Sequence, residues 1–170
     1  VNSMHDNSLF ELTIISNLPV EPFLAPHVNR IFEQNGIIIR TVAVNYNECN
    51  SSEALQRFAE SEFIAILLNL ENAHHGLLDG DSTTSASTII DLELEKARQI
   101  CGIISGSTNV SPLWFGYEDL QWNPSVVFGS QYALNGLVDK INSQIREGLD
   151  SGITFIDTKR LIASIGISNA

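Results

Sequence analysis

Cysteine, basic side chains and long apolar runs are all scarce in this chain of 170 residues. Its two cysteines, Cys49 and Cys101, are too few for a disulfide framework and do not lie at the spacing of metal ligands. Nine Lys and Arg stand against twenty Asp and Glu, so the formal charge is -11 at pH 7. This charge repels phosphate backbones and anionic lipid surfaces. We therefore expect a reducing, cytoplasmic setting, no metal, and no nucleic-acid or membrane partner.

Targeting segments and domain breaks are also missing from the sequence. The longest apolar runs, such as residues 63–68, are far shorter than the roughly 18 residues of a membrane span. Residues 1–8 are polar and lack the apolar centre of a signal peptide, and we expect them to form a flexible leader. Five prolines, eleven glycines and an apolar content of 44% predict one globular domain over residues 9–170. A helical pattern begins at Thr158 and stops abruptly, so we expect this domain to be cut from a longer chain.

Short apolar runs alternate with amphipathic stretches five times along the chain. Such alternation is typical of crossover units on a parallel sheet. It predicts a three-layer α/β/α sandwich with a five-stranded parallel sheet in the flavodoxin-like order 2-1-3-4-5. The expected strands are residues 9–16, 37–46, 63–69, 112–117 and 153–156.

Some helix ends and helix faces can also be predicted. Gly36 follows the first amphipathic stretch and predicts a left-handed helix stop. Asn50, with Glu53 three residues later, has the spacing of a capping box and predicts the start of the next helix. A longer helix after the third strand is predicted from a stripe of apolar residues. The stripe comprises Ile90, Leu94, Ala97, Cys101 and Ile104.

The strand order also predicts where a ligand binds. In doubly wound folds this place lies beyond the carboxyl ends of the strands, where the order reverses between strands one and three. Ser16 and Asn17 close the first expected strand and Asn69 closes the third, so we expect them in one crevice. The loop after strand one has no glycine to wrap a flavin phosphate, and these positions lack the carboxylates of a phosphoacceptor Mg²⁺ site. Neither a G-x-G-x-x-G nor a Walker motif occurs, and we expect no cofactor.

A serine at the tip of strand one suggests nucleophilic acyl transfer. That chemistry requires a hydroxyl, a base that takes its proton, and donors aimed at the oxyanion. Ser16 offers the hydroxyl, while Asn69 or Asn72 and backbone N–H groups near Asn17 offer donors. The alternative is that Ser16 merely caps the turn that follows, as serine commonly does.

Several short segments resemble the blocks of the SGNH (GDSL-like) hydrolase fold. They are residues 14–18 (IISNL), 45–47 (NYN), 68–72 (LNLEN), 114–117 (WFGY) and 155–157 (FID). More narrowly, the chain is similar to the domain that precedes the haloacid-dehalogenase-type phosphatase domain in FkbH-like proteins. The resemblance implies a bacterial biosynthetic setting, in polyketide or polysaccharide assembly. There the phosphatase-like domain handles a three-carbon phosphorylated acid and passes its acyl group to an acyl carrier protein.

The resemblance also implies roles for individual residues. Ser16 matches the nucleophile, and Asn69 or Asn72 matches the oxyanion asparagine. The glycine that the family has after strand two is replaced within residues 45–48, where Asn45 becomes a candidate for substrate binding beside Asn17. The oxyanion hole is therefore expected to be weakened.

In the last block the family has an acid followed three residues later by the histidine base. Here Asp157 is followed by Arg160 at that position, so the base is missing. Arginine stays protonated, and Arg160 is expected to bind a carboxylate or phosphate instead. His74 and His75 in the 71–85 loop offer a substitute base, although a solvated polar loop is the simpler interpretation.

Three hypotheses follow from the sequence. The first is an SGNH-like domain of an FkbH-type protein that binds a small acyl or phosphorylated substrate and has weak or lost hydrolase activity. The second is an active esterase or acyltransferase that uses Ser16 with a base from the 71–85 loop or from outside this chain. The third is an architectural module that orients a C-terminal phosphatase-type domain or mediates self-association. Any contact with an acyl carrier protein is expected through that neighbouring domain.

Overall fold

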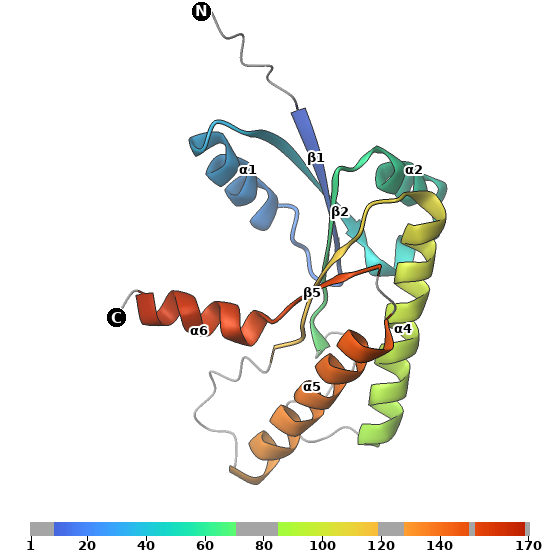
Figure 1. Cartoon of the computed structure of the whole chain (residues 1–170), viewed down its shortest axis with the longest axis vertical. Helices are drawn as coiled ribbons and strands as arrows, with labels where there is room; N and C mark the ends of the chain where they lie inside the picture. Colours follow the sequence, from blue (N-terminus) through green and yellow to red (C-terminus); the bar gives the residue numbers. More distant parts are fainter. Residues whose placement is uncertain (1–8, 71–84, 119–127, 150–151, 169–170) are drawn as a thin grey trace, which may run out of the picture.

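The computed structural model describes residues 9–70, 85–118, 128–149 and 152–168, with only the backbone given for 128–135 and 165–168. Its strands form one parallel sheet in the order β2-β1-β3-β4-β5 (Figure 1). This confirms the predicted fold class and strand order. The strands are β1 (Leu9–Ser16), β2 (Ile38–Asn45), β3 (Phe63–Leu67), β4 (Leu113–Phe115) and β5 (Thr154–Ile156), so β2 to β5 are shorter than expected.

Helices cover the two faces of this sheet unequally. One face carries α2, α4 and α5, with α4 packed against both α2 and α5, and the other face carries α1, which contacts β2. The last helix, α6, points away from the sheet beyond β5 (Figure 1). The described helices are α1 (Leu24–Gln34), the short 3-10 helix η1 (Tyr46–Glu48), α2 (Ser52–Glu60), α4 (Ala86–Ser107), α5 (Phe128–Gly148) and α6 (Thr158–Ser168).

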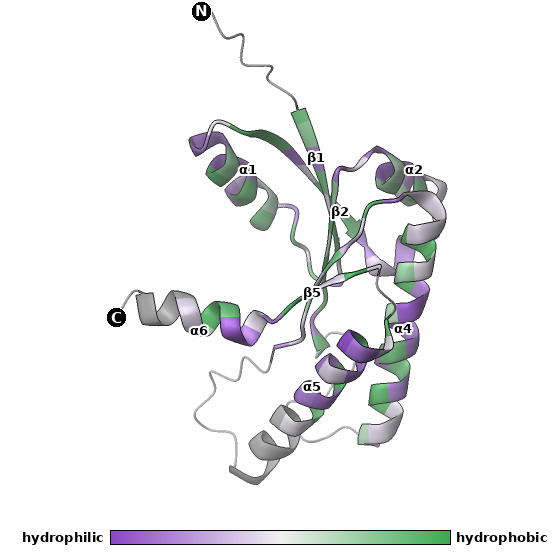
Figure 2. Ribbon diagram, viewed as in Figure 1, coloured by the Kyte–Doolittle hydropathy of each residue, from purple (hydrophilic) through white to green (hydrophobic). Residues whose placement is uncertain are grey.

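The alternation of side chains along the strands builds a separate apolar cluster on each face. The larger cluster joins Ile15, Ile66 and Trp114 to α2, α4 and α5. The smaller one joins Ile14 and Ala65 on the α1 side. Figure 2 shows the apolar colouring of the strands between the mixed colours of the helices. Because side chains alternate with a period of two, Ser16 shares the α1 side with Ile14.

Local signals confirm some of the predicted helix ends and correct others. Gly36 has φ 75°, which confirms the left-handed stop after α1. The capping box at Asn50 was wrong by one position, because Ser51 caps α2 and its hydroxyl accepts a hydrogen bond from Ala54 N at 3.1 Å. The stripe predicted for α4 packs on the core, where Leu94 and Cys101 are half-buried, but it did not include Glu93. The buried residues of α4 are Ile89, Ile90, Glu93, Ala97, Ile100 and Ile104.

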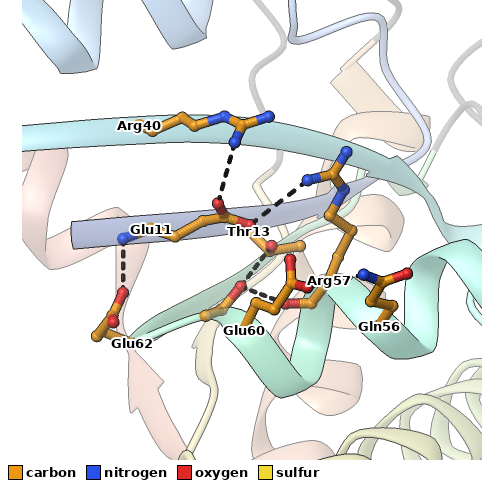
Figure 3. Close-up of polar contacts among 8 residues, drawn as sticks. Glu11, Thr13, Arg40, Gln56, Arg57, Glu60 and Glu62 are labelled. Carbon is orange, nitrogen blue, oxygen red and sulfur yellow. Dashed lines mark hydrogen bonds and ion pairs between the residues drawn. The ribbon is translucent and has the colours of Figure 1, made fainter. Parts of the chain in front are cut away.

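A polar network ties the end of α2 to the start of β1 (Figure 3). The Glu11 carboxylate pairs with Arg40 at 3.6 Å and with Arg57 at 3.9 Å. The hydroxyls of Thr13 and Ser61 are hydrogen-bonded at 2.7 Å and buried. These contacts lie near the amino end of β1, so they secure the fold on the side away from the carboxyl ends of the strands.

Candidate functional site

Ser16 lies at the carboxyl end of β1, as predicted, but it is almost fully buried. Its exposed fraction is 2%, and its Oγ accepts a hydrogen bond from Leu18 N at 3.0 Å. In this geometry the hydroxyl caps the turn after β1, which is the alternative role considered for this residue. The burial and the engaged lone pair both reduce the access of an ester carbonyl to the oxygen.

Asn17 and Asn69 meet where the strand order reverses. The side-chain amide of Asn17 donates to Asn69 O at 2.7 Å, and its Oδ1 accepts from Asn69 N at 2.8 Å. The Asn17 side chain thus binds both the N–H and the carbonyl group of Asn69, two residues after the end of β3. The ends of β1 and β3 therefore lie close together, as predicted. The Asn17 side chain holds the two segments that follow these strands against each other.

Asn45 is paired with Ser16 in the register of β1 and β2. Its Oδ1 accepts a hydrogen bond from Asn47 N at 3.0 Å, which caps η1. The side chain is exposed, so it stays open to solvent at the edge of the sheet. Like Ser16 and Asn17, it uses its polar group to hold a local turn.

Asp157 and Arg160 follow β5, which is three strands away from β1 and Ser16 in the sheet. Three strand intervals of about 4.8 Å separate β1 from β5, which places the backbones about 14 Å apart. The Asp157 carboxylate accepts from Arg160 N at 3.0 Å and so caps α6, and both residues are exposed. The remaining candidates, Asn72 and the histidine pair at 74 and 75, lie outside the described residues.

Sequence reasoning missed a buried charged group on the face of the sheet that carries α4. Glu93 in α4 has an exposed fraction of 0% and accepts hydrogen bonds from Tyr117 Oη and Lys96 Nζ. Lys96 Nζ also lies 5.4 Å from the centre of the Tyr46 ring, within the range of a cation–π interaction. A fully buried carboxylate is costly to desolvate, and donors such as Tyr117 and Lys96 offset that cost.

Burial and the neighbouring Glu93 charge together raise the pKa of Tyr117 well above its ordinary value. Burial comes first among these causes, followed by the charge of Glu93 and the hydrogen bond to it. Both disfavour a phenolate, because a second negative charge would then lie beside a carboxylate in a water-poor interior. The Tyr117 hydroxyl therefore keeps its proton and donates it in a hydrogen bond to Glu93.

Side chains from α5 and α6 hold the backbone of the segment after β4 in place. The Asn142 side chain accepts a hydrogen bond from Tyr117 N at 2.7 Å and donates one to Tyr117 O at 2.9 Å. Asn17 makes the same pair of hydrogen bonds with the backbone of Asn69. At Gly116 an added Cβ would lie 2.8 Å from the Phe155 ring, so only glycine fits without a shift. Thr158 Oγ1 closes the segment by donating to Gly116 O at 3.0 Å.

A groove of about 450 Å³ opens between η1 and α4, and Glu93 and Lys96 form part of its wall. The rest of the wall includes Tyr46, Asn47 and Gln99. Its volume is in the range typical of small-molecule sites. The groove lies on the side of the sheet that carries α4, whereas Ser16 faces the α1 side.

The sequence did contain a signal for this site. Glu93 is spaced three residues after Ile90 and four before Ala97, which is the spacing of a residue on the buried face of α4. An acid at such a position needs a partner, because a charge is almost never buried alone. The predicted stripe contained only apolar residues, so the buried Glu93 was overlooked.

The cysteines do not contribute a reactive thiolate. Burial raises the pKa of Cys49 to about 11 and that of Cys101 to about 11. Both are free thiols. In the described part of the chain, no group of three or more His, Cys, Asp and Glu side chains gathers as a metal site. None of the helices described there is long and apolar enough to cross a bilayer.

Comparison with known proteins adds one structural likeness. No family model matches the chain, and no curated protein matches it. Among solved structures, the chain is similar to the crystal structure of the lipase Lip_vut3 from a goat rumen metagenome, with a TM-score of 0.52. The two proteins share a fold. Their identity is 13% over 88% of this chain and 80% of the lipase chain, so the likeness concerns the fold alone.

Proposed function

We propose that this chain is an SGNH-like domain that binds a small acyl, ester or phosphorylated ligand and has weak or lost hydrolase activity. One observation carries the proposal: the hydroxyl of Ser16, at the position expected for the nucleophile, is buried and accepts a hydrogen bond from the turn that follows. The lipase-like fold supports the hydrolase ancestry of the sheet, and the state of Ser16 supports the loss of its chemistry.

The missing base supports the same conclusion. A serine becomes a nucleophile when a neighbouring group accepts its proton. Arg160 stands where the resemblance implies a histidine, and a guanidinium cannot accept a proton at any useful pH. The Asp157 carboxylate caps α6 on the far side of the sheet, so it does not act on Ser16 directly.

The biosynthetic part of the proposal rests on the sequence resemblance. In that setting the domain would precede a haloacid-dehalogenase-type domain, which would contact the acyl carrier protein in its place. The charge of -11 supports this division, because acyl carrier proteins are usually acidic and are repelled by an acidic surface. The two free thiols support a reducing, cytoplasmic compartment.

Activity-based labelling tests the proposal. The full chain is incubated with a fluorophosphonate probe and with p-nitrophenyl acetate, beside Ser16→Ala and a control, Ser61→Ala, which removes another buried hydroxyl. We expect no labelling and no hydrolysis above the buffer rate in any of the three. Labelling that disappears in Ser16→Ala and persists in Ser61→Ala would establish an active serine esterase and overturn the proposal.

Ligand binding is tested separately by thermal shift. Butyrate and 3-phosphoglycerate serve as probes of the acyl and the phosphorylated acid. We expect at least one of them to raise the melting temperature in a saturable way. If neither does, and labelling is also absent, the binding proposal fails and an architectural role is left.

A further inference from the structure

We propose that the groove between η1 and α4 is a binding site for an uncharged, polyhydroxylated ligand such as a sugar residue. This site is distinct from the acyl site considered above, because it opens on the α4 side of the sheet and Ser16 faces the α1 side. The proposal for the groove therefore does not depend on whether Ser16 is reactive.

Two of the three charged side chains in the wall of the groove, Glu93 and Lys96, neutralise each other. Glu93 is fully buried and holds Lys96 Nζ, whose side chain is only 19% exposed. Lys96 also lies against the Tyr46 ring, so its ammonium group is engaged on two sides. The pair therefore presents little net charge to a ligand.

The remaining polar groups in the groove are mostly side-chain amides. Asn47, Asn50 and Gln99 line it, and each carries a donor NH₂ and an acceptor carbonyl. Neighbouring hydroxyls of a sugar both donate and accept, so an amide can bind two of them at once. Ile100 and Ile103 supply apolar wall for the C–H face of a sugar ring.

An anionic ligand fits this groove poorly. Glu95 lies on the same wall, where it accepts a hydrogen bond from Gln99 Nε2 at 3.0 Å. The lysine in the wall, Lys96, is already paired with Glu93. A carboxylate or phosphate would therefore meet the negative charge of Glu95, beside a Lys96 that is already paired with Glu93.

Two-dimensional NMR of the full chain with ¹⁵N label tests the site. Methyl β-glucoside, methyl α-mannoside and N-acetylglucosamine are titrated as neutral probes, with glucuronate and acetate as anionic controls. We expect saturable shifts of the amides of η1 and α4 with at least one neutral sugar, at a Kd of about 1 mM. The anionic controls should bind at least tenfold more weakly.

Two matched variants decide whether the groove is responsible. Gln99→Ala removes an exposed amide from the wall, and we expect the Kd of the bound sugar to rise about fivefold. Gln56→Ala is the control, because Gln56 on α2 is also exposed and pairs with the acid at i+4, Glu60, but lies outside the groove. Failure of every neutral sugar to bind, equal or tighter binding of glucuronate, or equal effects of the two variants would each overturn the proposal.

Discussion

Removing one hydroxyl group should show how strongly the buried charge near the groove depends on its partners. Tyr117→Phe keeps the ring in the core but deletes the O–H that donates to Glu93 Oε2. The carboxylate, with an exposed fraction of 0%, then loses a donor where water cannot replace it. Lys96 stays as a partner, so the pair is weakened without becoming an isolated charge.

The magnitude follows from the type of bond that is lost. A hydrogen bond to a buried charged group contributes about 2 kcal/mol, so the free energy of unfolding should fall by about that amount. For a chain of this length, this corresponds to a decrease in melting temperature of about 6 °C. Tyr46→Phe is the matched control, because Lys96 lies over the ring of Tyr46 and the ring is kept. It should change stability by less than about 0.5 kcal/mol.

Urea unfolding at pH 7, followed by circular dichroism, measures both variants. A true stability change moves the midpoint and leaves the slope unchanged. The pH dependence adds a second readout, since the folded state raises the pKa of Tyr117 above its unfolded value of about 10. The folded protein then holds this proton more tightly, so wild-type stability is complete below pH 10 and declines as pH rises above it. Tyr117→Phe lacks this titrating group and should lose less stability in that range.

One result would refute the reasoning. If Tyr117→Phe unfolds at the same urea concentration as wild type, and the alkaline decline is equal in both, then Glu93 does not depend on the phenol. The carboxylate would in that case be satisfied by other groups, and the conclusion that the Tyr117 hydroxyl stabilises this buried charge would be wrong.

Other expectations follow from the same structure. Asn17→Ala removes both hydrogen bonds to the backbone of Asn69 and should lower the free energy of unfolding by about 1.5 kcal/mol in urea titrations. Gly116→Ala places a Cβ 2.8 Å from a neighbouring ring atom and should cost about 2 kcal/mol, whereas Gly102→Ala, with open space around it in α4, should add about 0.5 kcal/mol. The pKa of about 11 for Cys49 and Cys101 leaves little thiolate at pH 8, so both should react with iodoacetamide about a hundredfold more slowly than free cysteine. Equal stability of the two glycine variants, or rapid alkylation of either thiol in the folded protein, would contradict these statements.

The order of elements was predictable because it depends on periodicity along the chain. Alternating apolar runs and amphipathic stretches predicted the strand order 2-1-3-4-5, and the sheet has it. The parallel ends of β1 and β3 also bring Asn17 and Asn69 into direct hydrogen-bond contact, as the strand order led us to expect, while the ligand crevice expected there stays a prediction. Boundaries were less accurate, as at Ser51, because several polar residues in a row can each serve as a cap.

What the candidate site residues do was decided by tertiary structure. The sequence places a hydroxyl at Ser16 and a carboxylate at Asp157. It does not show whether these oxygens are accessible to a ligand or hydrogen-bonded to nearby backbone. Only the packed chain shows that Ser16 is buried and caps a turn, and that Asp157 caps α6 three strands away.

The sequence by itself determined which faces of the elements are apolar and therefore the layers of the fold. Tertiary structure decided which polar groups meet across those layers, because contacts such as Tyr117 with Glu93 join residues from different elements. Their energy depends on how completely water is excluded at the point of contact. That exclusion is a property of the assembled core. Spacing along α4 places Glu93 on the buried face of the helix, but its partner Tyr117 and the groove beside it could not be obtained from local sequence patterns.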